Sequence, residues 1–557
     1  MRSMIAILVL TLAAATAPAA AADSLDSLAK DFWTWRAAEQ PASGDDIPRL
    51  DRPDGWAPEV SMAALEARIE ELRAFEERFR ALPDVGPIPQ RVDRRLIGSA
   101  LARVRWELVV NPGWRRNPLF YVEQTLGSLF EDLILPPPFD ERRVENLLAR
   151  FDRIPATAAA ARTNLDQARA PFARLAVAAL ADADGRLAKV AKELAPLVPA
   201  GKAARLSSSA ATAGKALVDF RRWLEGEIPK LASDTAVGGE AYGFFLREVA
   251  LLPYSPERLV EMGRQEWERV VAFEVVEKNR RRDLPALSLP ASRAAQIETM
   301  DREAAWVREF LEREGIQSVP AWVKSYRLKA KPSYLEPLAD LGVNNDFTGP
   351  RRLDRDGTAW IDDPSPKAGY FYRAYAAEPR TQIAHESHGH YLQLVLSWAH
   401  PDWIRRHYYD SGANEGIAFY NEELMAQAGL FADRPKVREV IYNFARLRAL
   451  RVEVDVKLAT GQMSITEAAR ALTERVPMDP KTALDEAAFF ASAPGQAISY
   501  QIGKIQILRL LADARLAQGD AFSLRAFHDF LWLNGNVPLA LQRWELLGDG
   551  GDLVPRP

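Results

Sequence analysis

Amphipathic helical periodicity runs through most of this chain and limits the folds that it can adopt. In residues 61–82, apolar side chains recur at intervals of three or four residues, which is the spacing of one face of a helix, and Pro83 follows them. Similar patterns cover residues 94–110, 206–225, 293–313 and 435–458. The sequence therefore predicts a mainly α-helical fold.

Local signals support two of the helix starts. Ser255 and Pro256 provide a cap followed by a proline at the first helical position, and Ser464 with Glu467 has the spacing of a capping box. Residues 319–377 are the exception to the helical pattern, because residues 322–328 alternate and the segments 357–361 and 369–375 flank a loop rich in Pro and Asp. We expect a small β element there, beside the active-site helix, with an edge that could hold an extended peptide.

The chain is long enough for more than one core, since single cores rarely exceed about 300 residues. The stretch 194–204, rich in Pro and Ala, is the best candidate for a linker. We therefore expect an N-terminal helical region over 23–200 and a helical catalytic region over 201–557, packed together as one unit that forms a cleft. No repeat with a period of 20–50 residues is visible.

The N-terminus has the layout of a signal peptide. Arg2 precedes an uncharged apolar run over 4–15, and the small residues Ala20 and Ala22 suit a cleavage site near Ala22. The run is shorter than the roughly 20 residues that a membrane span needs, so we favour a cleaved signal peptide over 1–22 rather than an uncleaved anchor. The expected location is the bacterial periplasm or the extracellular space, without stable membrane association. The chain has no Cys, so neither a lipid-modified cysteine nor a disulfide contributes.

The net charge of the chain argues against one class of binding partner. The formal net charge is −4, and no run of five or six like charges occurs. Such a chain creates no strong positive field, so nucleic acid is not an expected partner.

The histidines point to a metal site. Five of the six lie within residues 385–407, and the core reads His385-Glu386-Ser-His388-Gly389-His390. Two His around a Glu is the arrangement of a helical zinc hydrolase, in which the imidazoles bind Zn²⁺ and the Glu takes a proton from the water that the metal activates. In a regular helix, however, positions i and i+5 lie about 140° apart. Either a π-type turn at Gly389 brings His390 round to His385, which we favour, or His385 and His388 form the pair.

Catalytic zinc keeps three protein ligands, and Glu415 is the candidate for the third. Asn414 could cap a helix that begins near Glu415, and a helical hairpin would return this carboxylate to the histidines. Glu422 lies two turns further on the same face, as a partner of a ligand or as an alternative ligand.

With these residues the chain resembles the domain of unknown function 885 family, a bacterial group with a largely helical zinc-peptidase-like fold. The resemblance rests on residues 380–393, 415–425, 451–455 and 494–503, and it implies a large helical zincin-like metallopeptidase fold with an HExxxH motif. The motif of this chain is one residue shorter than the family pattern and lacks its proline, which keeps His388 as an alternative ligand. Asp455 belongs to the third segment, as a possible ligand or partner of a ligand.

Residues 412–416 are also similar to the third-ligand segment of angiotensin-converting-enzyme-like peptidases. That likeness implies that Glu415 is the ligand, Glu386 the general base and Tyr500 a donor to the oxyanion, with Tyr372, Tyr408 and Tyr409 as rivals of Tyr500.

Together these observations predict an exported hydrolase that binds one Zn²⁺ per chain and cleaves peptide bonds of short peptides. Arg380, Arg373 and Lys504 lie near the motifs and could bind a substrate carboxylate. Two alternatives remain: a metal-dependent hydrolase of a non-peptide amide or a cell-wall fragment, and a catalytically inactive exported protein that binds metal.

Overall fold

The computed structural model describes residues 24–42 and 51–553. The predicted signal peptide, 1–22, lies outside the described residues. Within them, no helix combines the length and the apolar composition that a membrane crossing needs.

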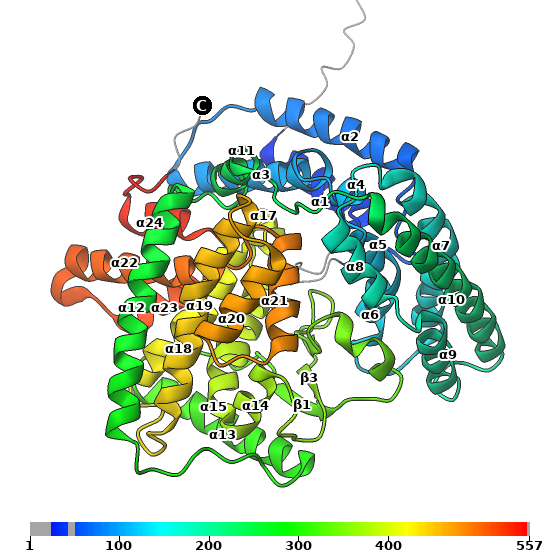
Figure 1. The fold of residues 1–557 in the computed structure, drawn as a ribbon. Helices are drawn as coiled ribbons and strands as arrows, with labels where there is room; N and C mark the ends of the chain where they lie inside the picture. Colours follow the sequence, from blue (N-terminus) through cyan, green and yellow to red (C-terminus); the bar gives the residue numbers. More distant parts are fainter. Residues whose placement is uncertain (1–23, 43–50, 554–557) are drawn as a thin grey trace, which may run out of the picture.

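The first helices form a layer over the C-terminal part of the chain (Figure 1). They are α1 (Leu25–Glu39), α2 (Met62–Ala81), α3 (Ile88–Arg105) and the π-helix η1 (Trp106–Val110). Their apolar faces share one core with Ile404, Tyr408 and Trp544, so the two ends of the described chain pack against each other.

A second group of helices stands at the right of Figure 1. It contains α4 (Gly113–Arg116), α5 (Leu119–Val122), the π-helix η2 (Glu123–Gly127), α6 (Ser128–Leu133), α7 (Glu141–Asn164), α8 (Ala170–Ala179), α9 (Ala183–Leu194), α10 (Lys202–Glu227) and the 3₁₀ turn η3 (Ile228–Lys230). Leu187 and Leu194 of α9 and Leu206 and Leu217 of α10 lie in one core. The predicted linker is therefore wrong: residues 195–201 connect two helices of the same core, and the predicted boundary at 200 does not separate two cores.

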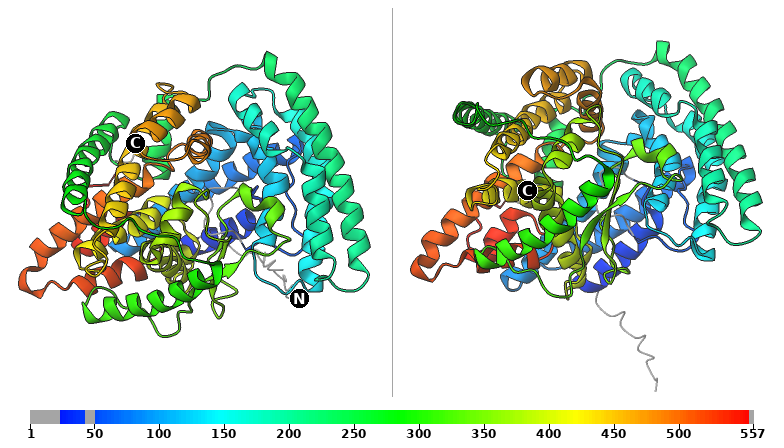
Figure 2. Two further views of the ribbon diagram at one scale, coloured as in Figure 1. Left: turned by 60° about the horizontal axis from the view of Figure 1, so that its bottom comes forward. Right: turned by 90° about the horizontal axis from the view of Figure 1, so that it is seen from below.

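The remaining helices form the larger body on the other side (Figures 1 and 2). They are α11 (Gly239–Phe244), η4 (Phe245–Val249), α12 (Pro256–Arg280), α13 (Arg293–Arg313), α14 (Tyr370–Ala377), α15 (Pro379–Gln382), η6 (Ile383–Tyr391), α16 (Leu392–Trp398), α17 (Trp403–His407), α18 (Ser411–Gln427), α19 (Val437–Ala459), α20 (Ile465–Arg475), α21 (Pro480–Ser492), α22 (Ser499–Gln518), η7 (Gly519–Ala521), α23 (Leu524–Leu533) and α24 (Leu539–Leu547). The predicted mainly helical fold is confirmed. Ser255 and Ser464 cap their helices as predicted, the latter in a capping box. Ser61 also caps its helix.

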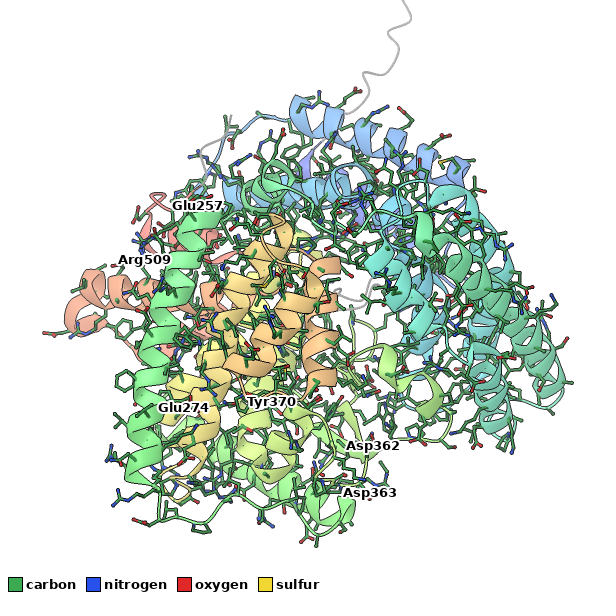
Figure 3. The ribbon with its side chains drawn as sticks, in the orientation of Figure 1. Glu257, Glu274, Asp362, Asp363, Tyr370 and Arg509 are labelled. Atoms are coloured by element: carbon green, nitrogen blue, oxygen red, sulfur yellow. The ribbon has the colours of Figure 1, made fainter. Side chains whose placement is uncertain are left out.

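The small β element is a three-stranded sheet. Its strands are β1 (Tyr326–Ala330), β2 (Asn345–Asp346) and β3 (Gly357–Ile361), with β3 in the middle, parallel to β1 and antiparallel to β2; the 3₁₀ turn η5 (Glu336–Leu341) lies between β1 and β2. The expected third extended segment, 369–375, is instead helix α14. Both edges of β3 are already paired, and the aromatic side chains of α14 pack around Phe444, so tertiary packing overrides the β propensity of this segment. Tyr370, labelled in Figure 3, begins this helix and hydrogen-bonds Asn443.

Helix α18 is held unusually close to its two neighbours. A Cβ atom at Gly389 of η6 would lie 2.6 Å from Cα of Ala418, and one at Gly416 would lie 2.7 Å from Cα of Gly503 in α22. The backbones of η6, α18 and α22 therefore approach one another to distances that only glycine permits.

We expect Gly503→Ala to lower the stability of the protein by about 1–3 kcal/mol, because the added methyl group overlaps the backbone of α18. Thermal unfolding followed by circular dichroism measures this. Gly226→Ala in α10, where nothing lies within 4 Å, is the control and should be neutral or slightly stabilising. A Gly503→Ala protein that melts like the wild type would contradict the close contact.

Candidate metal centre

The histidine motif lies on the π-helix η6. In a π-helix the backbone bonds link residues i and i+5, so side chains at this spacing lie on one face. His385 and His390 accordingly come together, with their Nε2 atoms 3.2 Å apart and their rings edge to face. The π-type turn at Gly389 that the spacing predicted is confirmed.

His388 leaves this face of the helix. Its side chain lines a separate pocket of about 270 Å³ between η6, α13 and the segment before β1. Burial and the nearby Arg308 lower the pKa of His388 to about 4. The geometry therefore groups His385 with His390 and leaves His388 out.

Glu415 completes the cluster from α18. Its Oε2 atom lies 3.2 Å from Nε2 of His390, and one ligand atom from each of His385, His390 and Glu415 lies within 4.8 Å of the others. All three side chains are buried. Two imidazoles and one carboxylate at this spacing fit the three protein ligands of a catalytic zinc site.

Asn414 does not cap α18 as the sequence predicted, but contacts His390. The cap of α18 is Asp410, whose side chain accepts the N–H of Ala413 at 2.8 Å, so the helix begins four residues before Glu415. The Asn414 amide oxygen instead accepts a hydrogen bond from Nδ1 of His390 at 2.5 Å. Its amide nitrogen donates to Gln393 at 2.7 Å, which fixes the orientation of the amide.

Partners on the far side of both rings orient the two imidazoles. His390 donates through Nδ1 to Asn414, and Nδ1 of His385 lies 2.8 Å from Oε1 of Glu422. If both rings are neutral, their protons lie on Nδ1, and the lone pairs on the two Nε2 atoms point towards each other and towards Oε2 of Glu415. This oxygen has no hydrogen-bond partner in the described chain. Three electron-pair donors that converge in a buried site repel one another unless a cation lies between them, and such outer partners are typical of metal-binding histidines.

The charges of the cluster lead to the same conclusion. Burial lowers the pKa of His390, but the carboxylates of Glu415 and Glu386 outweigh this and raise it to about 9. Burial likewise raises the pKa of Glu415, but His390 and His385 outweigh it and lower the value to about 2. A proton on His390 thus holds the place that a metal would take, because a metal ligand must be deprotonated.

Glu386 lies beside the cluster and, unlike the three candidate ligands, is only half-buried. Asn345 of β2 donates to its Oε2 atom at 3.2 Å. Tyr326 and Tyr375 lie near it: burial and the charge of Glu386 raise the pKa of both phenols, so both remain protonated. Tyr372 of α14 is half exposed. The sheet and α14 thus enclose the candidate general base.

Tyr500 enters the cluster from α22. Its hydroxyl lies near Glu415, and burial together with that carboxylate raises the pKa of the phenol. Of its rivals, Tyr408 lies in the core of the N-terminal helices, where its hydroxyl shares a hydrogen bond with Ser99 at 2.7 Å.

The other predicted site residues lie further out. Glu422 contacts His385 and also accepts a hydrogen bond from Arg448 at 3.2 Å, as a partner of the candidate ligand. Asp455 accepts the backbone N–H groups of Gly495, Ala497 and Ile498. It therefore fixes the segment that leads into α22 and is not part of the metal cluster.

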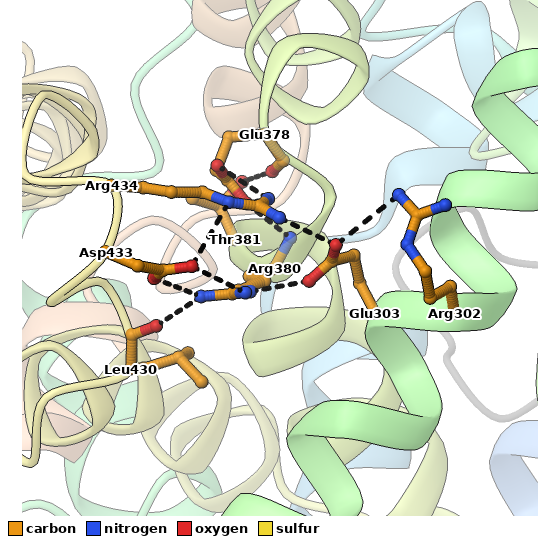
Figure 4. A network of polar contacts seen from close by, with 8 residues as sticks. All are labelled: Arg302, Glu303, Glu378, Arg380, Thr381, Leu430, Asp433 and Arg434. Carbon is orange, nitrogen blue, oxygen red and sulfur yellow. Dashed lines mark hydrogen bonds and ion pairs between the residues drawn. The ribbon is translucent and has the colours of Figure 1, made fainter.

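Two of the predicted substrate-binding cations are committed elsewhere. Arg380 donates to Glu303, Asp433 and the carbonyl of Leu430 in a network that ties α15 to α13 (Figure 4). Lys504 is fully buried and pairs with Glu266 and Glu423. Since their donors are used, both predictions of substrate binding are corrected to structural roles. Arg373, on α14, is half-buried, and its Nε atom has no hydrogen-bond partner in the described chain.

A cavity of about 970 Å³ lies between the two parts of the molecule, and none of the three candidate ligands is among its lining residues. Its walls come from both parts of the molecule: Trp35 and Trp114 from the N-terminal helices, and Tyr372, Gly412 and Ser499 from the elements that carry the site. This volume is at the upper end for small-molecule sites, and the walls are rich in aromatic side chains.

Sequence reasoning missed Asn345 and Arg448. Nothing in the sequence distinguishes Asn345 from other loop residues, because its place beside Glu386 depends on the sheet. Arg448 stands one helical turn before Arg451 on α19, so a helical count from that segment places it on the same side of the helix.

Comparison with known proteins gives a family and a fold. The model of a family described as "Bacterial protein of unknown function (DUF885)" matches residues 42–546. No curated protein matches the chain. Two solved structures are similar in fold. One is a candidate lipoprotein of unknown function from Shewanella oneidensis, with a TM-score of 0.71 and 18% identity over 94% of this chain and 100% of the other. The second is a candidate lipoprotein from Colwellia psychrerythraea, with a TM-score of 0.74 and 17% identity over 94% and 98%.

We expect the purified protein to bind about one zinc ion per chain, because the cluster offers three ligands and one open position. His390→Ala should lose this zinc, and His388→Ala should keep it. Elemental mass spectrometry measures the metal content, and zinc lost only in His388→Ala would contradict the grouping of His385 with His390.

We also expect Glu422→Gln to weaken zinc binding about 10–100-fold, because it removes the carboxylate that orients His385. Competition with a chelator measures the affinity. Glu423→Gln removes a neighbouring buried ion pair without touching an imidazole, so its zinc affinity should stay unchanged. Equal effects of the two variants would mean that loss of stability, and not the orientation of His385, weakens the site.

Proposed function

Because the chain belongs to DUF885, a bacterial family of unknown function, we propose an activity from its own residues: an exported zinc-dependent hydrolase that cleaves peptide bonds of short peptides. One observation carries the proposal. Two oriented imidazoles and a carboxylate converge at one buried point, directly beside a half-buried glutamate. A site that only stores metal has no use for such a base.

His385, His390 and Glu415 would hold the ion, as in gluzincin-type peptidases with a zincin-like fold. A bound zinc ion supplies a Lewis acid that polarises a carbonyl oxygen and lowers the pKa of a water molecule to about 7. Glu386, oriented by Asn345, accepts a proton from the attacking water and later delivers it to the leaving amine. The C–N bond breaks, the water oxygen stays with the acyl carbon, and the products are a carboxylate and an amine.

Tyr500 is our candidate for stabilising the developing negative charge. Its hydroxyl lies at Glu415, and its raised pKa keeps the proton on the phenol for donation to the substrate oxygen. Such a donor accelerates hydrolysis because the charge that it meets appears only in the transition state.

Export is part of the proposal. The layout of residues 1–22 favours it, and both similar structures are described as candidate lipoproteins.

The cavity of about 970 Å³ suits short substrates. Its apolar walls also suit a non-peptide amide, so an acylamino-acid panel beside a peptide library distinguishes the two substrate classes. A catalytically inactive metal-binding protein would cleave neither.

We expect Glu386→Gln to retain stoichiometric zinc and to lose peptide hydrolysis by at least about 10³-fold, because the amide cannot accept the proton. Peptide cleavage followed by mass spectrometry, with metal content in parallel, measures both. Glu474→Gln, a change on the surface of α20, should leave both unchanged. An active Glu386→Gln enzyme would exclude Glu386 as the base.

A further inference from the structure

Arg448 of α19 is an unusual residue beside the metal cluster. Its side chain is 2% exposed, and its Nη2 atom donates to Oε1 of Glu422 at 3.2 Å. Nε and Nη1, which carry three of its five N–H donors, have no hydrogen-bond partner in the part of the chain that the structure describes.

The surroundings of Arg448 explain why these donors are unused. The rings of Phe444, Phe371, Phe419 and Tyr500 lie 4.9, 5.5, 5.7 and 5.8 Å from the guanidinium carbon. Aromatic faces stabilise the charge of the cation, but they do not replace acceptors at its edges. A buried donor without an acceptor costs about 1–3 kcal/mol, so native proteins rarely keep one without a reason.

The position of the guanidinium supplies that reason. Glu422, which accepts from Arg448, contacts the imidazole of His385, so Arg448 lies two contacts from the metal cluster. Phe371, which covers the guanidinium, is also part of the cavity wall. The unused donors therefore lie between Glu422, which contacts the cluster, and Phe371, which belongs to the cavity wall.

A second guanidinium lies along the same wall. Arg451, one turn further on α19, packs over Tyr500 and Phe371 at 4.6 and 5.6 Å. It donates through Nε and Nη2 to a single oxygen of Glu486, whose side chain lines the cavity. Two buried guanidinium groups thus lie directly behind Phe371 and Glu486 of the cavity wall, whereas Arg380 and Lys504 are occupied by other partners.

We propose that Arg448, with Arg451 beside it, binds the C-terminal carboxylate of a short peptide, so that the enzyme removes one or two residues from the C-terminus. The inference rests on the proposed peptide hydrolysis. A carboxylate matches the donor set, because its two oxygens accept paired N–H groups from a guanidinium, and the bond is strong in a low-dielectric environment. We expect one or two residues to be removed, because only two contacts separate Arg448 from the metal cluster and an extended residue spans about 3.3–3.6 Å.

Two peptides that differ only at the C-terminus test this proposal. Both are the same N-acetylated apolar tetrapeptide, one with a free carboxylate and one with an amide. We expect kcat/KM of the zinc-loaded wild type to be about 100-fold higher for the acid. In Arg448→Met this ratio should fall towards one, mainly through a higher KM for the acid. Wild-type enzyme that cleaves both peptides equally overturns the inference and leaves peptide hydrolysis standing.

Matched variants separate binding from folding. Arg446→Met, on the same helix but paired with Glu274 of α12, should keep the preference for the acid. Arg448→Lys retains the charge without the paired donors and should lose most of the preference while keeping zinc. If Arg448→Met itself loses zinc, Arg448→Lys and the wild-type ratio still decide the question.

A binding measurement completes the test without turnover. Isothermal titration of zinc-loaded Glu386→Gln with the same two peptides should show tighter binding of the acid, and the additional change Arg448→Lys should abolish the difference. Equal affinity for the acid and the amide, or no binding of either, overturns the inference. Cleavage of no peptide by the wild type, with the acid still bound more tightly, would instead count against the proposed hydrolysis.

Discussion

The close packing of α18 between η6 and α22 is the contact on which the candidate site depends. Glycine at 389, 416 and 503 lets the three backbones approach within a distance that any side chain would prevent. The consequence is functional, because η6 carries the two imidazoles, α18 carries Glu415 and Glu422, and α22 carries Tyr500. A wider spacing would separate groups whose chemistry requires them to lie within a few ångströms.

A second set of contacts converts this proximity into a defined donor arrangement. Asn414 accepts from Nδ1 of His390, and Oε1 of Glu422 lies 2.8 Å from Nδ1 of His385, so that both Nε2 atoms face the same point. Glu422 is in turn held by Arg448, whose charge lies in an aromatic environment. The buried carboxylates of Glu415 and Glu422 both have lowered pKa values, so a cation held between the imidazoles is complementary to the charge of the cluster. Orientation and charge therefore favour the same occupant.

The N-terminal helices matter to the site although they supply none of its polar groups. They pack against α17 and α24, which closes the molecule, and with α14 and α21 they enclose the cavity. Residues before and after position 200 in the sequence belong to one core. The chain therefore does not divide there into a binding part and a catalytic part. The cavity arises because two helical layers meet over the elements that carry the site.

The sequence by itself determined the features that depend on neighbours along the chain. Helical periodicity and caps predicted the long helices, and the spacing of His385, Gly389 and His390 predicted the π-helix, because these are local backbone properties. The same reasoning failed for α14, for the start of α18 and for Arg380, and it did not find Arg448. The start of α18 is set by a local cap that was assigned to the wrong residue, since Asp410 and not Asn414 caps the helix. The other three depend on a partner further away in sequence: Phe444 beside α14, Glu303 beside Arg380, Glu422 beside Arg448. Only the tertiary structure decided which polar groups are satisfied and which remain available, because burial and hydrogen-bond partners are set by packing between segments and not by the order of residues within one.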